Sequence, residues 1–135
     1  MTKRILLDTN CLLVCVPKQS PFRWVFDKIL AGELELVVST EILLEYEEIL
    51  TQFYSAEYAE VIIKVLVNLP NVIKVSPISF NWLLITQDPD DNKFVDAYVA
   101  SGADLLITND KHYKALEKIT FPPISFCKLV EFEVS

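Results

Sequence analysis

Short, almost continuous apolar runs alternate along the chain with longer segments in which apolar residues recur every three or four positions. The continuous runs predict buried strands at residues 3–7, 34–38, 72–75 and 104–108. The periodic segments predict helices at residues 21–30, 40–53, 55–69, 90–101 and 112–118. Residues 80–85 fit neither pattern, and residues 125–134 alternate in the manner of a strand at the edge of a sheet.

The order of these elements predicts an α/β fold. Strands and helices alternate, and the two glycines, Gly32 and Gly102, each follow a predicted helix. Such alternation is typical of a mainly parallel central sheet covered by helices. The adjoining segments 40–53 and 55–69 predict a helical hairpin. A chain of 135 residues suffices for one sizeable core, so we expect a single domain over residues 1–135.

Composition narrows the classes of protein. Hydrophobic residues make up 52% of the chain, but no run approaches the roughly 18 apolar residues of a membrane span. The first four residues lead directly into a strand and do not resemble a signal peptide, so we expect a cytoplasmic protein. The net charge of −7 argues against a protein that coats nucleic acid, although it allows an enzyme with a local basic rim.

The cysteines do not form a recognisable metal motif. Cys11, Cys15 and Cys127 are an odd set without a Cys-x-x-Cys pair, which predicts reduced, mostly buried thiols. Together with His112 they could form a Cys3His zinc site, but the paired spacing of such sites is absent.

Two acidic residues end apolar runs. Asp8 follows the first predicted strand, and Asp110 follows the run at 105–107. Ligands of open parallel sheets bind beyond the carboxyl ends of the strands, so neighbouring strands would direct both carboxylates to one crevice. Ordinary turn chemistry is the alternative for each of them. Four short polar neighbours could hydrogen-bond the acids or a bound water: Thr9, Asn10, Thr108 and Asn109.

A third acid comes from the helix predicted at 40–53. On a helical wheel Glu45 lies at the flank of the apolar face, whereas Glu41, Glu47 and Glu48 point away from it. Glu45 is therefore the glutamate that we expect to face inward. A glutamate at the edge of a core helix, with its carboxylate reaching solvent, is the alternative.

The fourth acid belongs to the segment 88–92, where helix capping explains Asp88 and Asp90. Asp91 aligns on the helical wheel with the apolar residues that follow, whereas Lys93 and Asp96 are predicted to point outward. A calcium loop would need Gly at its sixth position and Glu at its twelfth, which are Lys and Val here.

Taken together, these motifs resemble PIN-domain ribonucleases over nearly the whole chain. The resemblance is carried by the opening Ile-Leu-Leu-Asp-Thr-Asn at 5–10, Ser-Thr-Glu-Ile-Leu-Leu-Glu-Tyr at 39–46, Asp-Pro-Asp-Asp-Asn-Lys-Phe at 88–94, and Gly-Ala-Asp-Leu-Leu-Ile-Thr-Asn-Asp at 102–110. It is closest to small prokaryotic PIN proteins proposed as toxins of toxin–antitoxin pairs. It implies a three-layer α/β/α sandwich in which Asp8, Glu45, Asp91 and Asp110 form the acidic quartet.

The resemblance further implies an endoribonuclease that uses Mg²⁺ or Mn²⁺, an RNA substrate and an antitoxin partner. It also implies a homodimer, for which the high apolar fraction is an independent indication. Candidate phosphate contacts are Lys18, Arg23, Lys93, Lys111 and Lys114, and for each of them a solvated surface position is the favoured alternative.

Three alternatives remain. A housekeeping RNA-processing nuclease and a PIN-like module that binds RNA or protein without cleavage would share the same motifs. A phospho-receiver module is disfavoured, because Val38-Ser39 offers no acceptor aspartate at a middle strand end.

Overall fold

The computed structural model describes residues 2–76, 92–110 and 124–132. Within them one sheet of five strands has the order β3-β2-β1-β4-β5, and all neighbouring strands are parallel. The strands are β1 (Lys3–Leu7), β2 (Leu34–Val38), β3 (Val72–Lys74), β4 (Leu105–Ile107) and β5 (Phe126–Cys127). β1 is central, and β5 forms the edge that the sequence predicts.

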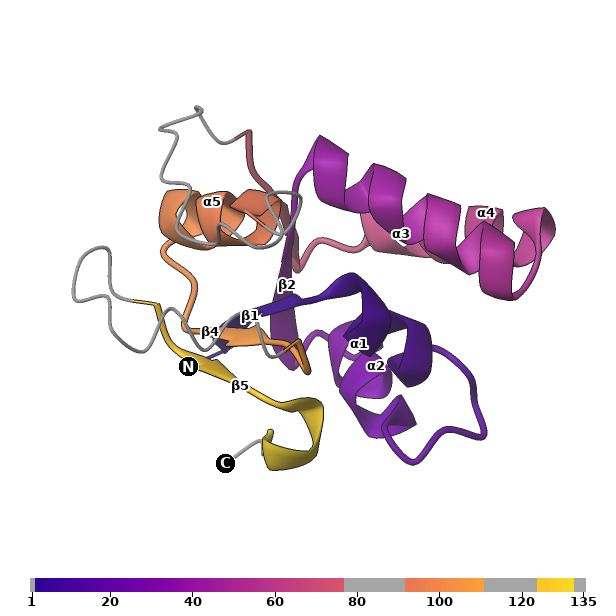
Figure 1. Ribbon diagram of the computed structural model, residues 1–135, viewed down its shortest axis with the longest axis horizontal. Helices are drawn as coiled ribbons and strands as arrows, with labels where there is room; N and C mark the ends of the chain where they lie inside the picture. The colour runs from indigo at the N-terminus through magenta and orange to yellow at the C-terminus, as the bar shows by residue number, and fades with distance from the viewer. Residues whose placement is uncertain (1, 77–91, 111–123, 133–135) are drawn as a thin grey trace.

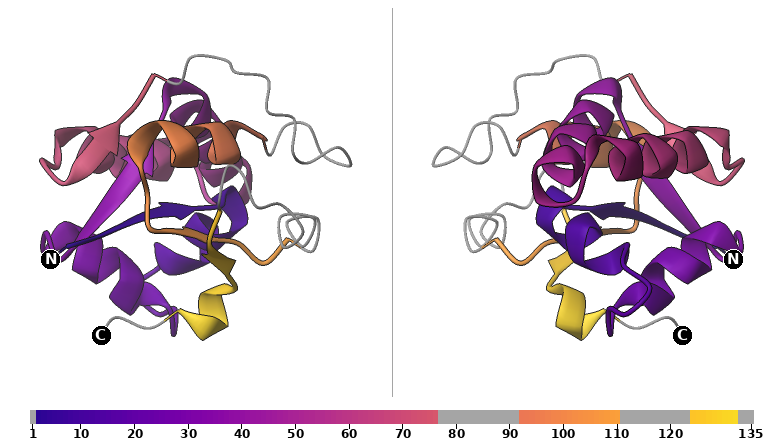
Figure 2. Two further views of the ribbon diagram at one scale, coloured as in Figure 1. Left: turned by 90° about the vertical axis from the view of Figure 1, so that its left-hand side faces the viewer. Right: turned by 90° about the vertical axis from the view of Figure 1, so that its right-hand side faces the viewer.

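Helices cover both faces of this sheet. They are α1 (Thr9–Cys15), α2 (Arg23–Leu30), α3 (Thr40–Phe53), α4 (Ala56–Asn68) and α5 (Asn92–Ser101). Figures 1 and 2 show α3, α4 and α5 on one face of the sheet and α1 and α2 on the other. The predicted three-layer sandwich and the α3–α4 hairpin are confirmed. Among the described helices, none has both the length and the apolar composition needed to cross a membrane.

Burial explains why the central strands are continuous apolar runs. Ile5, Leu6 and Leu7 have no exposed surface, since helices pack on both faces of β1. In the register of β1 with β4, Leu7 lies opposite Ile107. The residues that follow these two strands therefore emerge next to each other.

Two local features differ from the sequence analysis. Turn chemistry is the alternative given there for Asp8, but Asp8 instead caps α1, a helix that the sequence analysis does not predict and that Pro17 follows closely. The predicted strand 125–134 is also too long, because a 3₁₀ helix, η3 (Leu129–Glu131), follows β5 directly. The predictions for residues 80–85 and 112–118 lie outside the described residues.

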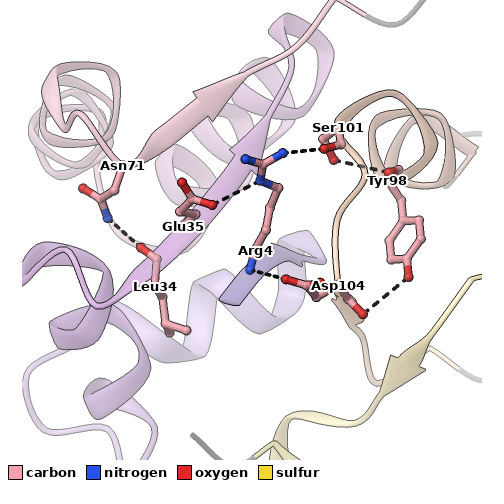
Figure 3. A network of polar contacts seen from close by, with 7 residues as sticks. All are labelled: Arg4, Leu34, Glu35, Asn71, Tyr98, Ser101 and Asp104. Carbon is pink, nitrogen blue, oxygen red and sulfur yellow. Dashed lines mark hydrogen bonds and ion pairs between the residues drawn. The ribbon is translucent and has the colours of Figure 1, made fainter. Parts of the chain in front are cut away.

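The amino ends of the strands are joined by a polar network around Arg4 (Figure 3). The Arg4 Nε atom lies 3.1 Å from Glu35 Oε1 on β2, and Arg4 Nη1 donates to the carbonyl of Ser101 at 2.5 Å. The backbone N–H of Arg4 donates to the Asp104 carboxylate at 2.8 Å. This network fixes the carboxyl end of α5 against β1 and β2, at the amino ends of the strands, whereas Asp8 lies at the carboxyl end of β1.

Candidate functional site

Asp8 lies at the carboxyl end of the central strand, and it is buried. Its backbone N–H donates to the carbonyl of Ile107 at 2.9 Å, which extends the pairing of β1 with β4. Its Oδ1 atom accepts a hydrogen bond from the N–H of Thr9, the first residue of α1, at 2.7 Å, and Asp8 occupies the N-cap position of that helix. The carboxylate is thus held at the start of α1, and its side chain is 6% exposed.

Thr108 joins Asp8 to the segment that carries Asp110. The Thr108 hydroxyl donates to Asp8 Oδ2 at 2.9 Å, and the Asp110 N–H donates to Thr108 Oγ1 at 3.1 Å. β1 and β4 are neighbours, so the expectation that Asp8 and Asp110 meet at one end of the sheet is confirmed. Thr108 itself is buried.

Glu45 reaches the same site from α3. Its Oε2 atom accepts a hydrogen bond from the Thr9 hydroxyl, and its Oε1 atom lies 2.8 Å from the Lys93 ammonium on α5. The three other glutamates of the helix, Glu41, Glu47 and Glu48, are exposed, as the helical wheel predicts. A continuous chain of polar contacts therefore runs from β4 to α5, through Thr108, Asp8, Thr9, Glu45 and Lys93.

Tyr46, the residue after Glu45, fixes the position of α3. Its hydroxyl donates to the carbonyl of Leu7, the last residue of β1, and its side chain is completely buried. Burial raises the pKa of this phenol well above its usual value, so the hydroxyl stays protonated as a donor. The contact links the helix that carries Glu45 to the strand that precedes Asp8.

Burial raises the pKa of Asp8 above its usual value. The hydrogen bonds from Thr108 and Thr9 oppose this shift, whereas the negative charges of Asp110 and Glu45 add to it. Ionised Asp8 is therefore disfavoured by its surroundings, and a cation at the site would relieve this cost.

Two predicted orientations on α5 are wrong. The Lys93 side chain is 12% exposed and points to Glu45 rather than outward. Asp96 is half-buried, and its Oδ1 atom has no hydrogen-bond partner among the described residues. Burial, together with the charge of Glu41, raises the pKa of Asp96. A helical wheel follows the direction of Cβ, but a lysine has four methylenes and can reach around the helix.

The remaining predicted site residues differ in placement. Asn10 is exposed on the first turn of α1. Asn109 accepts a hydrogen bond from the Leu129 N–H at 3.1 Å, so it holds η3 to the end of β4. Asp91 lies outside the described residues.

The chemistry of these donors suits a hard divalent cation, because carboxylate oxygens are the ligands that such ions prefer. Across residues 2–76, 92–110 and 124–132, no three acidic, cysteine or histidine side chains are grouped to hold a metal ion. Asp8, Glu45 and Asp110 are instead connected through Thr108 and Thr9, and Glu45 also contacts Lys93.

The cysteines are unsuited to zinc. Cys11 and Cys15 are buried, and burial raises the pKa of each thiol to about 12. At neutral pH both are protonated, whereas a zinc ligand is a thiolate. All three cysteines are free, as predicted.

A second surface feature is an apolar groove of about 530 Å³. It lies between α2, the loop that precedes it and the α3–α4 hairpin. Tyr54, Val61 and Phe26 contribute apolar surface, and Lys18 and Arg23 contribute positive charge. The groove does not include the acidic residues.

Several solved structures share this fold. VapBC2 from Rickettsia felis, bound to a DNA fragment from its promoter, matches with a TM-score of 0.63 and 16% identity, over 93% of this chain and 98% of that one. DNA-bound VapBC from Salmonella typhimurium matches with a TM-score of 0.60 and 16% identity, over 96% and 99%. FitAcB from Neisseria gonorrhoeae matches with a TM-score of 0.59 and 16% identity, over 95% and 99%.

A comparison with curated proteins finds no match. The family model of the PIN domain matches residues 4–112, which include Asp8, Glu45, Asp91 and Asp110. PIN domains are nucleases, generally ribonucleases. The chain therefore belongs to the PIN domain family.

Proposed function

We propose that this protein is a divalent-metal-dependent endoribonuclease that hydrolyses RNA phosphodiester bonds. The observation that carries the proposal is the polar chain from Thr108 through Asp8 and Thr9 to Glu45, at the carboxyl end of the central strands. Membership of the PIN family supports it. The acids are buried or half-buried there, at the position where open parallel sheets bind their ligands.

In this proposal Asp8, Glu45, Asp91 and Asp110 hold Mg²⁺ or Mn²⁺. The bound metal would lower the pKa of the attacking water and stabilise the leaving oxygen. Thr108 orients the Asp8 carboxylate, and Thr9 orients that of Glu45. Hydrogen bonds of this kind fix carboxylates so that little reorganisation is needed during the reaction.

Cleavage of a fluorescent RNA by the purified chain tests this function. We expect cleavage with Mg²⁺ or Mn²⁺, loss of cleavage with EDTA, and a reduction of 100-fold or more, roughly, in Glu45→Gln. Glu47→Gln is the matched control, because Glu47 is an exposed acid on the same helix. Cleavage that persists in EDTA, or that is equal in both variants, would refute the proposal.

We further propose that the nuclease is the toxin of a toxin–antitoxin pair. The similar solved structures are of VapBC and FitAcB, which are toxin–antitoxin proteins of the same fold. An antitoxin could neutralise the acidic site with an Arg or Lys side chain, whose charge replaces that of the metal. The cytoplasmic location remains a prediction.

The apolar groove is the surface that we propose for this partner. The exposed Lys18 in its lining favours a segment that is apolar with an acidic flank, whereas Arg23 is already paired with Asp27. Coexpression with the product of the adjacent gene should rescue growth and give a stable complex. Val61→Glu should weaken that complex without loss of RNA cleavage. A chain that is harmless when overexpressed, and binds no product of an adjacent gene, would contradict the toxin proposal.

We also propose a homodimer. Several large apolar side chains are exposed on the described part of the chain, among them Leu44, Phe53 and Val130. Size-exclusion chromatography with light scattering should report twice the mass of the chain. A monomer at micromolar concentration would refute this proposal and leave the nuclease proposal intact.

A further inference from the structure

We propose that Lys93 is the internal counter-ion of the acidic site and that it sets the affinity of the site for divalent metal. The inference rests on the proposed nuclease function. It assigns a role in the site to a basic residue, in addition to the four acids.

Position and burial distinguish Lys93 from a surface lysine. Its ammonium lies 2.8 Å from Glu45 Oε1, and its side chain is 12% exposed. In the surface ion pair of Lys64 with Glu60, by comparison, the two side chains are 70% and 64% exposed. Glu45, with a side chain that is 27% exposed, is also more buried than Glu60. Surface pairs contribute little, whereas a partly buried pair is screened less by water and interacts more strongly.

Helix chemistry does not explain a lysine at this place. Lys93 is the second described residue of α5, and the amino end of a helix favours negative rather than positive charge. Side chains on a helix lean toward its amino end, which directs this lysine to the end that faces Glu45. The Lys93 ammonium also lies 5.6 Å from the ring centroid of the buried Phe94. The contact with Glu45 therefore explains the presence of a lysine at position 93 better than the charge preference of a helix end does.

The two oxygens of Glu45 have different partners. Thr9 donates to Oε2, and Lys93 contacts Oε1. Thr9 also donates its N–H to Asp8, so the positive charge of Lys93 is three contacts away from Asp8, the most buried of the described acids of the site. Lys93 thereby fixes the orientation of Glu45 and offsets part of the negative charge that attracts a metal ion.

The charge of Lys93 opposes the entry of a cation, whereas its contact with Glu45 supports catalysis. Removal of Lys93 should therefore raise metal affinity and lower kcat. A variant with a neutral residue at position 93 should bind divalent metal more tightly, because it lacks a unit of positive charge near the ion. It should also lower kcat, because Glu45 loses the contact that orients it. A residue that merely anchors α5 would not raise metal affinity when removed.

Calorimetric titration of Mn²⁺ into the metal-stripped full chain tests the inference. At low ionic strength we expect Lys93→Met to bind Mn²⁺ about tenfold more tightly than the unmodified chain, and Lys93→Arg to bind it with similar affinity. Lys93→Gln, which is also neutral, should behave like Lys93→Met and replaces it if that variant does not fold. Lys64→Met is the matched control, because it removes one exposed charge from α4, a helix that carries none of the four acids.

Equal or weaker Mn²⁺ binding by the neutral variants would overturn the inference, and so would equal tightening by Lys64→Met. Steady-state cleavage supplies a second readout, in which Lys93→Met should lower kcat more than it changes KM, and Lys93→Arg should restore most of kcat. A failure of the nuclease proposal is distinguishable, because the unmodified chain itself would then neither bind Mn²⁺ nor cleave RNA.

Discussion

Thr9 connects two acids that belong to different parts of the fold. Its N–H holds Asp8, and its hydroxyl holds Glu45. A threonine in the first turn of a helix is ordinary in sequence, and the second role follows only from the position of α3. Its function in the site depends on tertiary structure, although its short hydroxyl side chain made it a candidate from the start.

Thr9→Val should therefore reduce cleavage while leaving the fold intact. Valine has nearly the same shape, but it cannot donate to Glu45, and the loss of such a supporting hydrogen bond costs about 10- to 100-fold in activity. Thr40→Val, at an exposed position of α3, is the control. Unchanged kcat in Thr9→Val would show that Glu45 does not need this contact.

Asp8→Asn should abolish cleavage and stabilise the metal-free protein. The pKa of Asp8 is raised in the folded state, so the native state binds a proton more readily than the unfolded state does. The free energy of unfolding of the unmodified chain should then fall as pH rises from about 4 through the raised pKa. Asparagine removes this pH dependence. Thermal melts at several pH values measure it, and Asp27→Asn, a change at an exposed acid, should not reproduce it.

At the scale of elements, α3 depends on one buried hydroxyl for its place over β1. Tyr46→Phe leaves the carbonyl of Leu7 without that donor, so the free energy of unfolding should fall by about 1–2 kcal/mol. Tyr54→Phe removes a hydroxyl that donates to Leu13 at 2.8 Å in a more exposed position, and it should cost less. Urea denaturation compares the two. Equal losses would mean that burial does not strengthen the Tyr46 contact.

The elements that were predicted correctly are those whose pattern matches their burial. β1 and β2 are continuous apolar runs because both of their faces are covered, and α3 has one apolar face because its other face is exposed. α1 was missed because its residues after Asn10 are all apolar, which leaves no helical period, and because it has only seven residues. η3 depends on the Asn109 side chain, a contact that no local pattern reveals.

The site, like the fold, was predictable where local sequence determines it. Asp8, Asp110 and Glu45 follow from strand ends and from one helical face, which are properties of local sequence. The contact of Lys93 with Glu45 joins α5 to α3 across 48 positions of the sequence, so no local pattern predicts it. The placement of Asp91 remains a prediction.

At the scale of the whole molecule, pH should control metal binding through Asp8. Burial and the nearby charges of Asp110 and Glu45 raise the pKa of Asp8, so a proton and a metal ion compete for this carboxylate. Divalent affinity should fall as pH drops from about 8 to about 6. Calorimetry in buffers of different ionisation enthalpy would also count the protons released. Affinity that is independent of pH would contradict a clustered site.

The hydrogen bond from Thr108 to Asp8 spans 100 positions of the sequence, and it has a consequence for biosynthesis. A ribosome releases β1 and α1 early, but β4 must emerge before Thr108 can donate to Asp8 and before Asp110 can reach the site. Parallel pairing of strands this distant is a late event in folding. Under the ribonuclease function proposed above, we therefore expect nascent chains to be inert toward the messenger and ribosomal RNA around them, so that a cell makes the protein without damage to the machinery that translates it.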